Sequence, residues 1–170
     1  MGALWLFMLI LATACTGHYK PFTQSEQAEY DKASRNIYPD DVRLDPTKYS
    51  DTLVVWPGII VETSLEESSE QLLVTFVLEH HYFDWLDDSS IQKERYFFSA
   101  RGEGQFQLTW TFKPDSNREN FRRWTAPGVL LIVYGKPHVD GSDIKLTASH
   151  ISPIEKKYYR SDWDYGRAEK

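Results

Sequence analysis

The chain has 170 residues, a formal net charge of −6 at pH 7, and 41% hydrophobic and 15% aromatic residues. This length and hydrophobic content suit one domain with one sizeable core. The acidic balance argues against electrostatic binding of nucleic acid, which needs clustered Lys and Arg. A single cysteine excludes an intramolecular disulfide.

The N-terminal segment is a short apolar run that ends at this cysteine. Residues 3–14 are apolar or small, and the run is too short to span a bilayer, which takes about 20 residues. Ala12-Thr13-Ala14-Cys15 resembles a bacterial lipobox, in which small residues precede the cysteine whose sulfur takes the lipid. We therefore predict a lipoprotein signal peptide over residues 1–14 and lipidation of Cys15. The alternative is an ordinary signal peptide cleaved near Ala14, which would leave Cys15 as a free thiol.

The expected location follows from the residues around the cysteine. Two or more acyl chains on Cys15 would give stable anchoring where one chain does not. Thr16 stands where enterobacterial lipoproteins kept at the inner membrane carry Asp. We therefore expect a chain that is attached to the outer membrane through lipid on Cys15 and faces the periplasm.

The next segment, residues 15–45, is polar and interrupted by proline, which is typical of a tether between lipid and domain. Residues 25–35 are compatible with one or two helical turns, although they offer few apolar positions. Asp45 followed by Pro46 predicts the start of a short helix, because Asp is a good N-cap and proline suits the first turn.

Residues 46–155 are expected to form an all-β domain. Pro57-Gly58 interrupts the first apolar run, which predicts a bulge or sharp bend there. Polar turns are expected over residues 63–70 and 135–143, the second around the turn pair Asp140-Gly141, and a loop over 113–120. Pro153 is expected to end the last strand. The expected strands are 53–61, 71–81, 94–100, 105–112, 129–134 and 144–151.

The strand at 105–112 alternates clearly, with Phe106 and Leu108 among the residues on one face and Gln and Thr on the other. Five to six strands, a bent first strand and a closing hairpin predict a small Greek-key or OB-like barrel. Closure would remove the exposed strand edges.

Several segments resemble the Slp family of bacterial outer-membrane lipoproteins. Asp45-Pro46-Thr47-Lys48-Tyr49 followed by Trp56-Pro57-Gly58-Ile59 is similar to the family's Pro-x-x-Tyr stretch and Trp-Gly-Gly-x-Ile strand, with Pro57 in place of Gly. The apolar run ending in Tyr134-Gly135 and the C-terminal Trp163-Asp164-Tyr165-Gly166 also resemble family segments. The resemblance implies a membrane-associated protein and brings no catalytic residues.

The strongest candidate for chemistry is the pair His80-His81, with acidic residues after it in Asp84-Trp85-Leu86-Asp87-Asp88. Adjacent residues of a strand point to opposite faces, so the pair is poorly placed to share one metal. We favour strand-end histidines beside a solvated acidic loop over a metal-assisted hydrolase centred on His80 or His81. No nucleophile motif, phosphate loop or metal-ligand spacing is evident, so we predict no catalytic residue, no metal and no cofactor.

The candidate binding residues are Arg118, Arg122, Arg123 and Trp124, a basic and aromatic patch in an acidic chain. Such a patch suits an envelope protein, anionic lipid or lipopolysaccharide, and the alternative is a solvated loop. Residues 156–170 are predicted to be an aromatic and basic tail that either meets the membrane interface or packs on the barrel.

The sequence therefore favours a non-enzymatic envelope lipoprotein of Slp-like type that acts as a structural or binding module. The alternative is a lipoprotein that binds a small ligand or oligosaccharide in an OB-like cleft.

Overall fold

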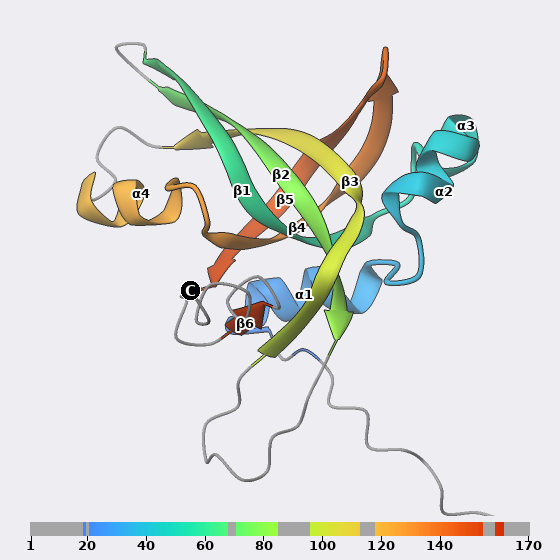
Figure 1. Cartoon of the computed structure of the whole chain (residues 1–170), viewed down its shortest axis with the longest axis horizontal. Helices are drawn as coiled ribbons and strands as arrows, with labels where there is room; N and C mark the ends of the chain where they lie inside the picture. The colour runs from blue at the N-terminus through green and yellow to red at the C-terminus, as the bar shows by residue number, and fades with distance from the viewer. Residues whose placement is uncertain are drawn as a thin grey trace, which may run out of the picture.

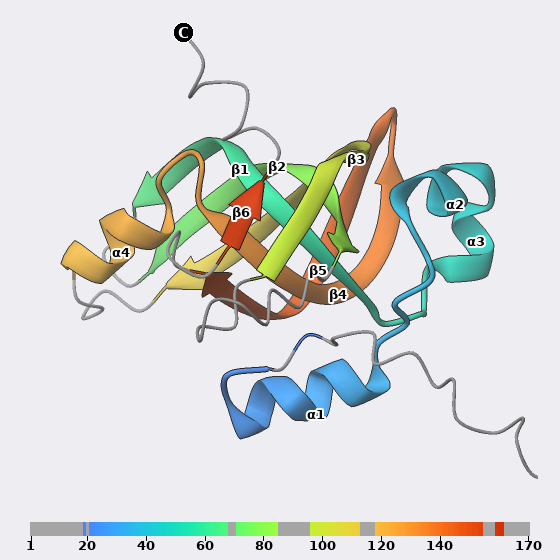
Figure 2. The same ribbon diagram turned by 60° about the horizontal axis from the view of Figure 1, so that its bottom comes forward.

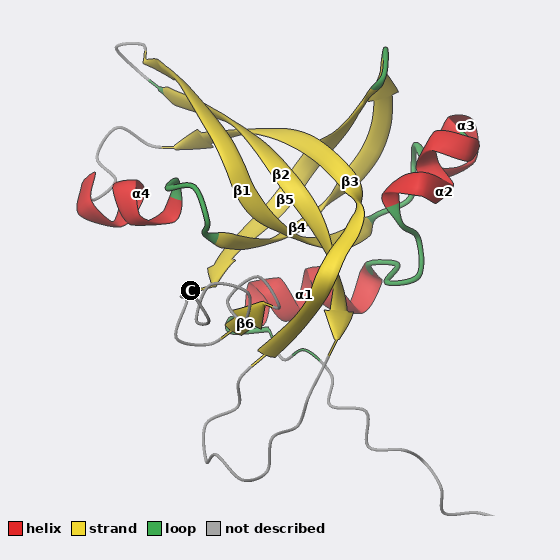
Figure 3. Ribbon diagram, viewed as in Figure 1, coloured by secondary structure: helices red, strands yellow, loops and turns green. Residues whose placement is uncertain are grey.

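The protein is built around one β-sheet that closes on itself (Figures 1 and 3). The computed structural model describes Tyr19 and residues 21–67, 71–84, 96–112, 118–154 and 159–161. The elements in these ranges are α1 (Gln24–Lys32), α2 (Pro39–Leu44), α3 (Pro46–Tyr49), β1 (Val54–Glu67), β2 (Leu72–Asp84), β3 (Tyr96–Phe112), α4 (Arg118–Trp124), β4 (Leu130–Asp140), β5 (Asp143–Ile154) and β6 (Tyr159–Ser161).

Five strands form the ring. β1 pairs antiparallel with both β2 and β4, β2 pairs with β3, and β4 pairs with β5. A short parallel pairing between β3 and β5 closes the ring, and β6 adds to β3 outside it. The helix α4 lies between β3 and β4 in the chain. The predicted all-β, OB-like barrel of five to six strands is therefore confirmed.

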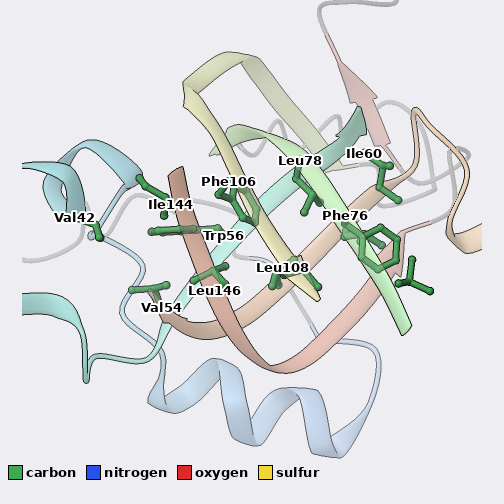
Figure 4. Packing of buried hydrophobic residues seen from close by; sticks show 13 residues of the cluster. Val42, Val54, Trp56, Ile60, Phe76, Leu78, Phe106, Leu108, Ile144 and Leu146 are labelled. Atoms are coloured by element: carbon green, nitrogen blue, oxygen red, sulfur yellow. The ribbon is translucent and has the colours of Figure 1, made fainter. Parts of the chain in front are cut away.

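Apolar side chains fill the interior of the barrel (Figure 4). The predicted alternation in β3 is confirmed at Phe106 and Leu108, which are buried, whereas Gln105 and Thr109 are exposed. Burial of each large apolar side chain contributes about 1.5–3 kcal/mol, so this cluster is the main stabilising element of the fold. Its buried members are Val42, Val54, Trp56, Ile60, Val74, Phe76, Leu78, Phe106, Leu108, Leu131, Val133, Ile144 and Leu146.

The strands are longer than the turn-forming residues predicted. β1 continues through part of the polar stretch expected to be a turn, and β3 is one strand across Gly102 and Gly104. β4 and β5 meet at a two-residue turn, in which Gly141 has φ of +64°, and β5 continues past Pro153. Ladder pairing with a neighbouring strand outweighs the local preference of single polar or Pro residues.

Pro57-Gly58 does not make the expected bulge. The register between β1 and β4 is regular through both residues, and the irregularity with β2 lies between Ile60 and Glu62. The glycine has a packing role, because a Cβ at Gly58 would lie 2.9 Å from the Cβ of Leu78 and from the Cζ of Phe106.

The predicted tether over residues 15–45 is wrong for the part that the structure describes. Tyr19 is buried, and α1 and α2 pack against the barrel through Tyr30, Ala33 and Val42 (Figure 2). The predicted capping of α3 is confirmed, because the Asp45 side chain accepts a hydrogen bond from the backbone nitrogen of Lys48. The segment is folded because Tyr19, Tyr30, Ala33 and Val42 are buried in the clusters that they form with barrel residues.

Candidate functional site

The first buried polar cluster joins α1 to the barrel and is formed by Glu26, Tyr19 and Tyr134. Glu26 is 0% exposed, yet its carboxylate accepts hydrogen bonds from the Tyr19 hydroxyl at 2.5 Å and the Tyr134 hydroxyl at 3.1 Å. The backbone nitrogen of Phe22 donates to the other carboxylate oxygen at 3.0 Å. Three donors satisfy a carboxylate that would be costly to bury alone. We call these residues the Glu26 cluster.

The hydroxyl of Tyr134 is held in its protonated form. Burial and the neighbouring Glu26 carboxylate both raise the pKa of Tyr134 above its usual value. Because this hydroxyl donates to Glu26, it is a structural hydrogen bond donor, not an acid. The Glu26 cluster therefore attaches the N-terminal segment to β4.

The second cluster surrounds His80, which is 1% exposed at the end of the barrel covered by α2. The rings of Trp56, Phe106, Tyr82 and Tyr38 all lie edge-on to the imidazole, with centroids 5.3–6.5 Å away. These five residues form the His80 cluster. His81 is also buried. The two histidines were expected at the end of a strand, whereas β2 continues beyond them to Asp84. The acidic residues 85–88 lie outside the described part of the chain.

Hydrogen bonding defines the protonation state of His80. The backbone nitrogen of Glu103 donates to His80 Nδ1 at 3.1 Å, so the ring hydrogen is on Nε2. Nε2 is buried and has no hydrogen-bond partner among the described residues. Burial, with smaller contributions from His81 and Arg43, lowers the pKa of His80 to about 3. The imidazole is therefore neutral at physiological pH.

A polar network connects the His80 cluster to α2. Glu103 accepts hydrogen bonds from the Tyr82 hydroxyl at 2.7 Å and from the backbone nitrogen of Asp40 at 2.8 Å. Arg43 donates to the backbone oxygen of Glu103 at 2.9 Å and pairs with Asp40. The indole nitrogen of Trp56 donates to the backbone oxygen of Ile37 at 2.7 Å. The contacts of Asp40, Arg43 and Ile37 fix residues 37–43 at the end of the barrel, and the bond from Tyr82 holds the Glu103 carboxylate in place.

The predicted basic patch lies on α4, not on a loop. Residues 118–120, which were expected to be in a loop, begin this helix. Phe121 holds α4 to the barrel through an edge-on contact with Phe112, at a centroid distance of 5.1 Å. Arg122 and Arg123 are exposed and Trp124 is half-buried, whereas the side chain of Arg118 lies outside the described part. The structure therefore brings Arg122, Arg123 and Trp124 onto one short helix.

A polar surface that sequence reasoning did not identify covers the outside of β1, β2 and β3. Thr75 and Thr109 share a hydrogen bond across the two strands at 3.0 Å, and Gln107 bonds Asp143 at 3.3 Å. The described residues named below supply hydroxyls, amides and three carboxylates and include no basic or aromatic side chain, and the aliphatic Leu73 and Val77 lie among them on β2. We call it the polar face; its residues are Glu62, Ser64, Glu66, Thr75, Glu79, Gln105, Gln107, Thr109 and Thr111.

The polar face is poorly suited to single-stranded nucleic acid. Such binding combines stacking on aromatic rings with a basic groove. The alternating pattern of β3 predicted the polar side, but only the closed barrel shows that it continues over β1 and β2.

The described residues were also compared with the requirements of a metal site and of a membrane-spanning helix. Within the described ranges, no three His, Cys, Asp or Glu side chains are grouped so that they could hold a metal ion. In the same part of the chain, no helix has the length and apolar character needed to cross a bilayer. Cys15 precedes the described residues.

No family model and no curated protein matches the chain.

Proposed function

We propose that the chain is a non-enzymatic binding module of the bacterial envelope, of Slp-like type, anchored to the outer membrane through lipid on Cys15 and facing the periplasm. The observation that carries the binding role is the filled barrel. Among the described residues, twelve buried side chains from β1–β5 occupy its interior and Val42 of α2 packs against them, so the exterior of the barrel is the surface available to a partner. The lipobox-like Ala12-Thr13-Ala14-Cys15 supports the anchor, and the Slp-like type rests on the motifs quoted above.

The roles of the buried polar groups support a module without catalysis. His80 is neutral with Nδ1 occupied, and Glu26 is saturated by donors that attach α1. These groups are used to fix the N-terminal segment. A general acid or base instead needs an accessible proton and a pKa near the working pH.

The anchor is tested by labelling cells with radioactive palmitate. We expect label in the wild-type chain and none in Cys15→Ala, which should leave the membrane fraction. Label in both chains, or in neither, would contradict lipidation of Cys15.

The proposed partner surface is α4, with an envelope protein or lipopolysaccharide as partner. Exposed Arg122 and Arg123 next to half-buried Trp124 offer positive charge beside an aromatic ring. We expect Arg122→Ser/Arg123→Ser to abolish co-sedimentation with lipopolysaccharide and photocrosslinking to proteins in intact membranes. Lys48→Ser/Lys136→Ser removes two exposed charges elsewhere and serves as the control. Equal effects of both double variants would argue against this surface.

The polar face favours a second candidate function, which is binding of a small ligand or oligosaccharide. Its hydroxyls and amides match the hydrogen bonding of a sugar, and OB-type barrels bind ligands over this region. A screen by ligand-induced thermal shift tests the idea. Any hit should be lost in Gln105→Ala and retained in Thr147→Ala, an exposed position on β5.

A further inference from the structure

We infer that the lipid anchor holds the barrel with α1 against the bilayer, so that the outward side of α1 is a membrane-contacting surface. This inference rests on the proposed lipidation of Cys15. The orientation follows from the short distance along the chain between the lipid on Cys15 and Tyr19, which is fixed to the barrel. The partner is a phospholipid surface.

Tyr19, the first residue that the structure describes, is 2% exposed. Its hydroxyl bonds Glu26, and its ring lies 5.6 Å from that of Tyr30 and 5.9 Å from that of Phe83. These contacts join Tyr19 to α1 and to β2. The position of Tyr19 on the barrel is therefore set by the fold and is not free to follow the membrane.

The connection between lipid and barrel is short. Tyr19 is four residues after Cys15, and four residues span at most about 14 Å when fully extended. A flexible Gly/Ser linker of 20 residues would instead give a root-mean-square separation of about 25 Å. With so short a connection, the side of the domain that carries Tyr19 must stay next to the headgroups.

The outward side of α1 has a charge and an exposed ring that suit a position next to lipid headgroups. Its charges are Asp31, the half-buried Glu29 and Lys32, which lies 3.7 Å from Glu29, so this side carries one net negative charge in a chain whose net charge is −6. A surface with so little net charge meets less repulsion at anionic lipids than a strongly acidic one would. Phe22, at the start of the helix, is 52% exposed and supplies an apolar ring that suits the interface. The remaining exposed residues are small or polar: Thr23, Gln24, Ser25, Gln27 and Ala28.

The β4–β5 hairpin lies on the side of the molecule opposite to α1. Figures 1 and 2 show α1 on one side of the barrel and the β4–β5 hairpin projecting from the other. The exposed carboxylates Glu62 and Glu66 lie on β1 in the polar face. With α1 at the bilayer, the β4–β5 hairpin points into the periplasm.

A fluorescence experiment on the full lipidated chain tests this orientation. Cys15 is the only cysteine, so Ala28→Cys on α1 and Ser142→Cys in the β4–β5 turn each introduce one free thiol for a fluorophore. The proteins are placed in phosphatidylethanolamine and phosphatidylglycerol vesicles that carry a headgroup nitroxide quencher. We expect quenching at position 28 to be several-fold stronger than at position 142. Inserting 20 Gly/Ser residues between Gly17 and His18 should reduce that difference.

The outcomes distinguish a failure of the proposed lipid anchor from a failure of the proposed orientation. Mass spectrometry of the same samples reports whether Cys15 carries lipid, and a chain without lipid overturns the proposed anchor. Equal quenching at both positions of a lipidated chain, or stronger quenching at position 142, overturns the orientation and leaves the anchor intact. An unchanged difference after the insertion contradicts the role of the short connection.

Discussion

The N-terminal segment is attached to the barrel at two places, and these differ in how their buried polar groups are satisfied. In the Glu26 cluster, both carboxylate oxygens accept hydrogen bonds, from Tyr19, Tyr134 and the backbone of Phe22. In the His80 cluster, Nδ1 accepts a hydrogen bond, whereas Nε2 is buried without a hydrogen-bond partner among the described residues. A charged group can be buried only with dedicated donors, whereas an imidazole can be buried by staying neutral.

The two clusters also hold the N-terminal segment through different kinds of contact. The Glu26 cluster fixes α1 over β4 through directional hydrogen bonds, so its loss leaves several polar atoms unpaired. The His80 cluster fixes residues 37–43 mainly by packing of rings, with polar contacts of Glu103 and Arg43 at its edge. Removing one polar atom should therefore cost more in the first cluster than in the second.

The largest effect is expected from Glu26→Ala. The hydroxyls of Tyr19 and Tyr134 would lose their acceptor while buried, at about 1–3 kcal/mol each. We expect the free energy of unfolding to fall by about 3–5 kcal/mol, as measured by urea denaturation. Glu29→Ala is the control on the same helix, because its contact with Ser149 is exposed. A loss in Glu26→Ala no larger than in this control would refute the comparison.

Gly102→Ala tests the packing of the His80 cluster. A Cβ at Gly102 would lie 2.1 Å from Nδ1 of His80 and 2.8 Å from its backbone oxygen, so the strand or the ring must move. We expect a loss of about 2–3 kcal/mol in thermal or urea unfolding, typical of overpacking. Thr109→Ala, at an exposed site on the same strand, should stay within about 0.5 kcal/mol of the wild type. A stable Gly102→Ala chain would show that the cluster is loosely packed.

These two clusters also mark the limit of sequence reasoning. The pattern of β3, the capping of α3 and the turn pair Asp140-Gly141 were predicted because each depends on neighbouring residues. The attachment of α1 to the barrel was not predicted, because the residues that face the barrel are Glu26, Tyr30 and Ala33. A hydrophobic pattern does not predict burial of a charged residue such as Glu26. Its donor Tyr134 lies 108 residues away in the chain.

The burial of His80 could not be predicted from the sequence either. Its position in β2 was predicted, but its burial depends on Tyr38, on Trp56 and on the absence of a side chain at Gly102. The patch on α4 was predicted by composition, whereas its helical form was missed because residues 113–120 are rich in loop-forming types. Long-range packing decided each of these cases.

The pH dependence of stability should report the neutral state of His80. Its pKa in the folded protein is about 3, below the usual 6.5, so the unfolded chain binds the proton more readily. Stability is therefore fully present above about pH 6.5 and is lost as the pH falls toward 3, by up to about 1.4 kcal/mol per unit. His80→Asn keeps an acceptor for the Glu103 nitrogen and should have a shallower slope between pH 4 and 6. Parallel slopes in the two proteins would mean that His80 does not resist protonation.

The smallest effect is expected from Tyr82→Phe, at the edge of the His80 cluster. The change keeps the ring contacts with Tyr38 and His80 and removes one donor to Glu103, which retains the Asp40 nitrogen. We expect a loss below about 1 kcal/mol at pH 7, because the remaining acceptor sites can reach water.

An alkaline titration adds a second readout for the same variant. The hydrogen bond to Glu103, and to a lesser extent burial, raises the pKa of Tyr82 to about 12. Its contribution to stability is present below about pH 10 and is lost as the pH rises through about 12. In tyrosinate absorbance, Tyr82→Phe should therefore lack one of the groups that ionise late. If the late-ionising groups are unchanged, or if the loss at pH 7 matches that of Glu26→Ala, the two attachments do not differ in the way their hydrogen bonds indicate.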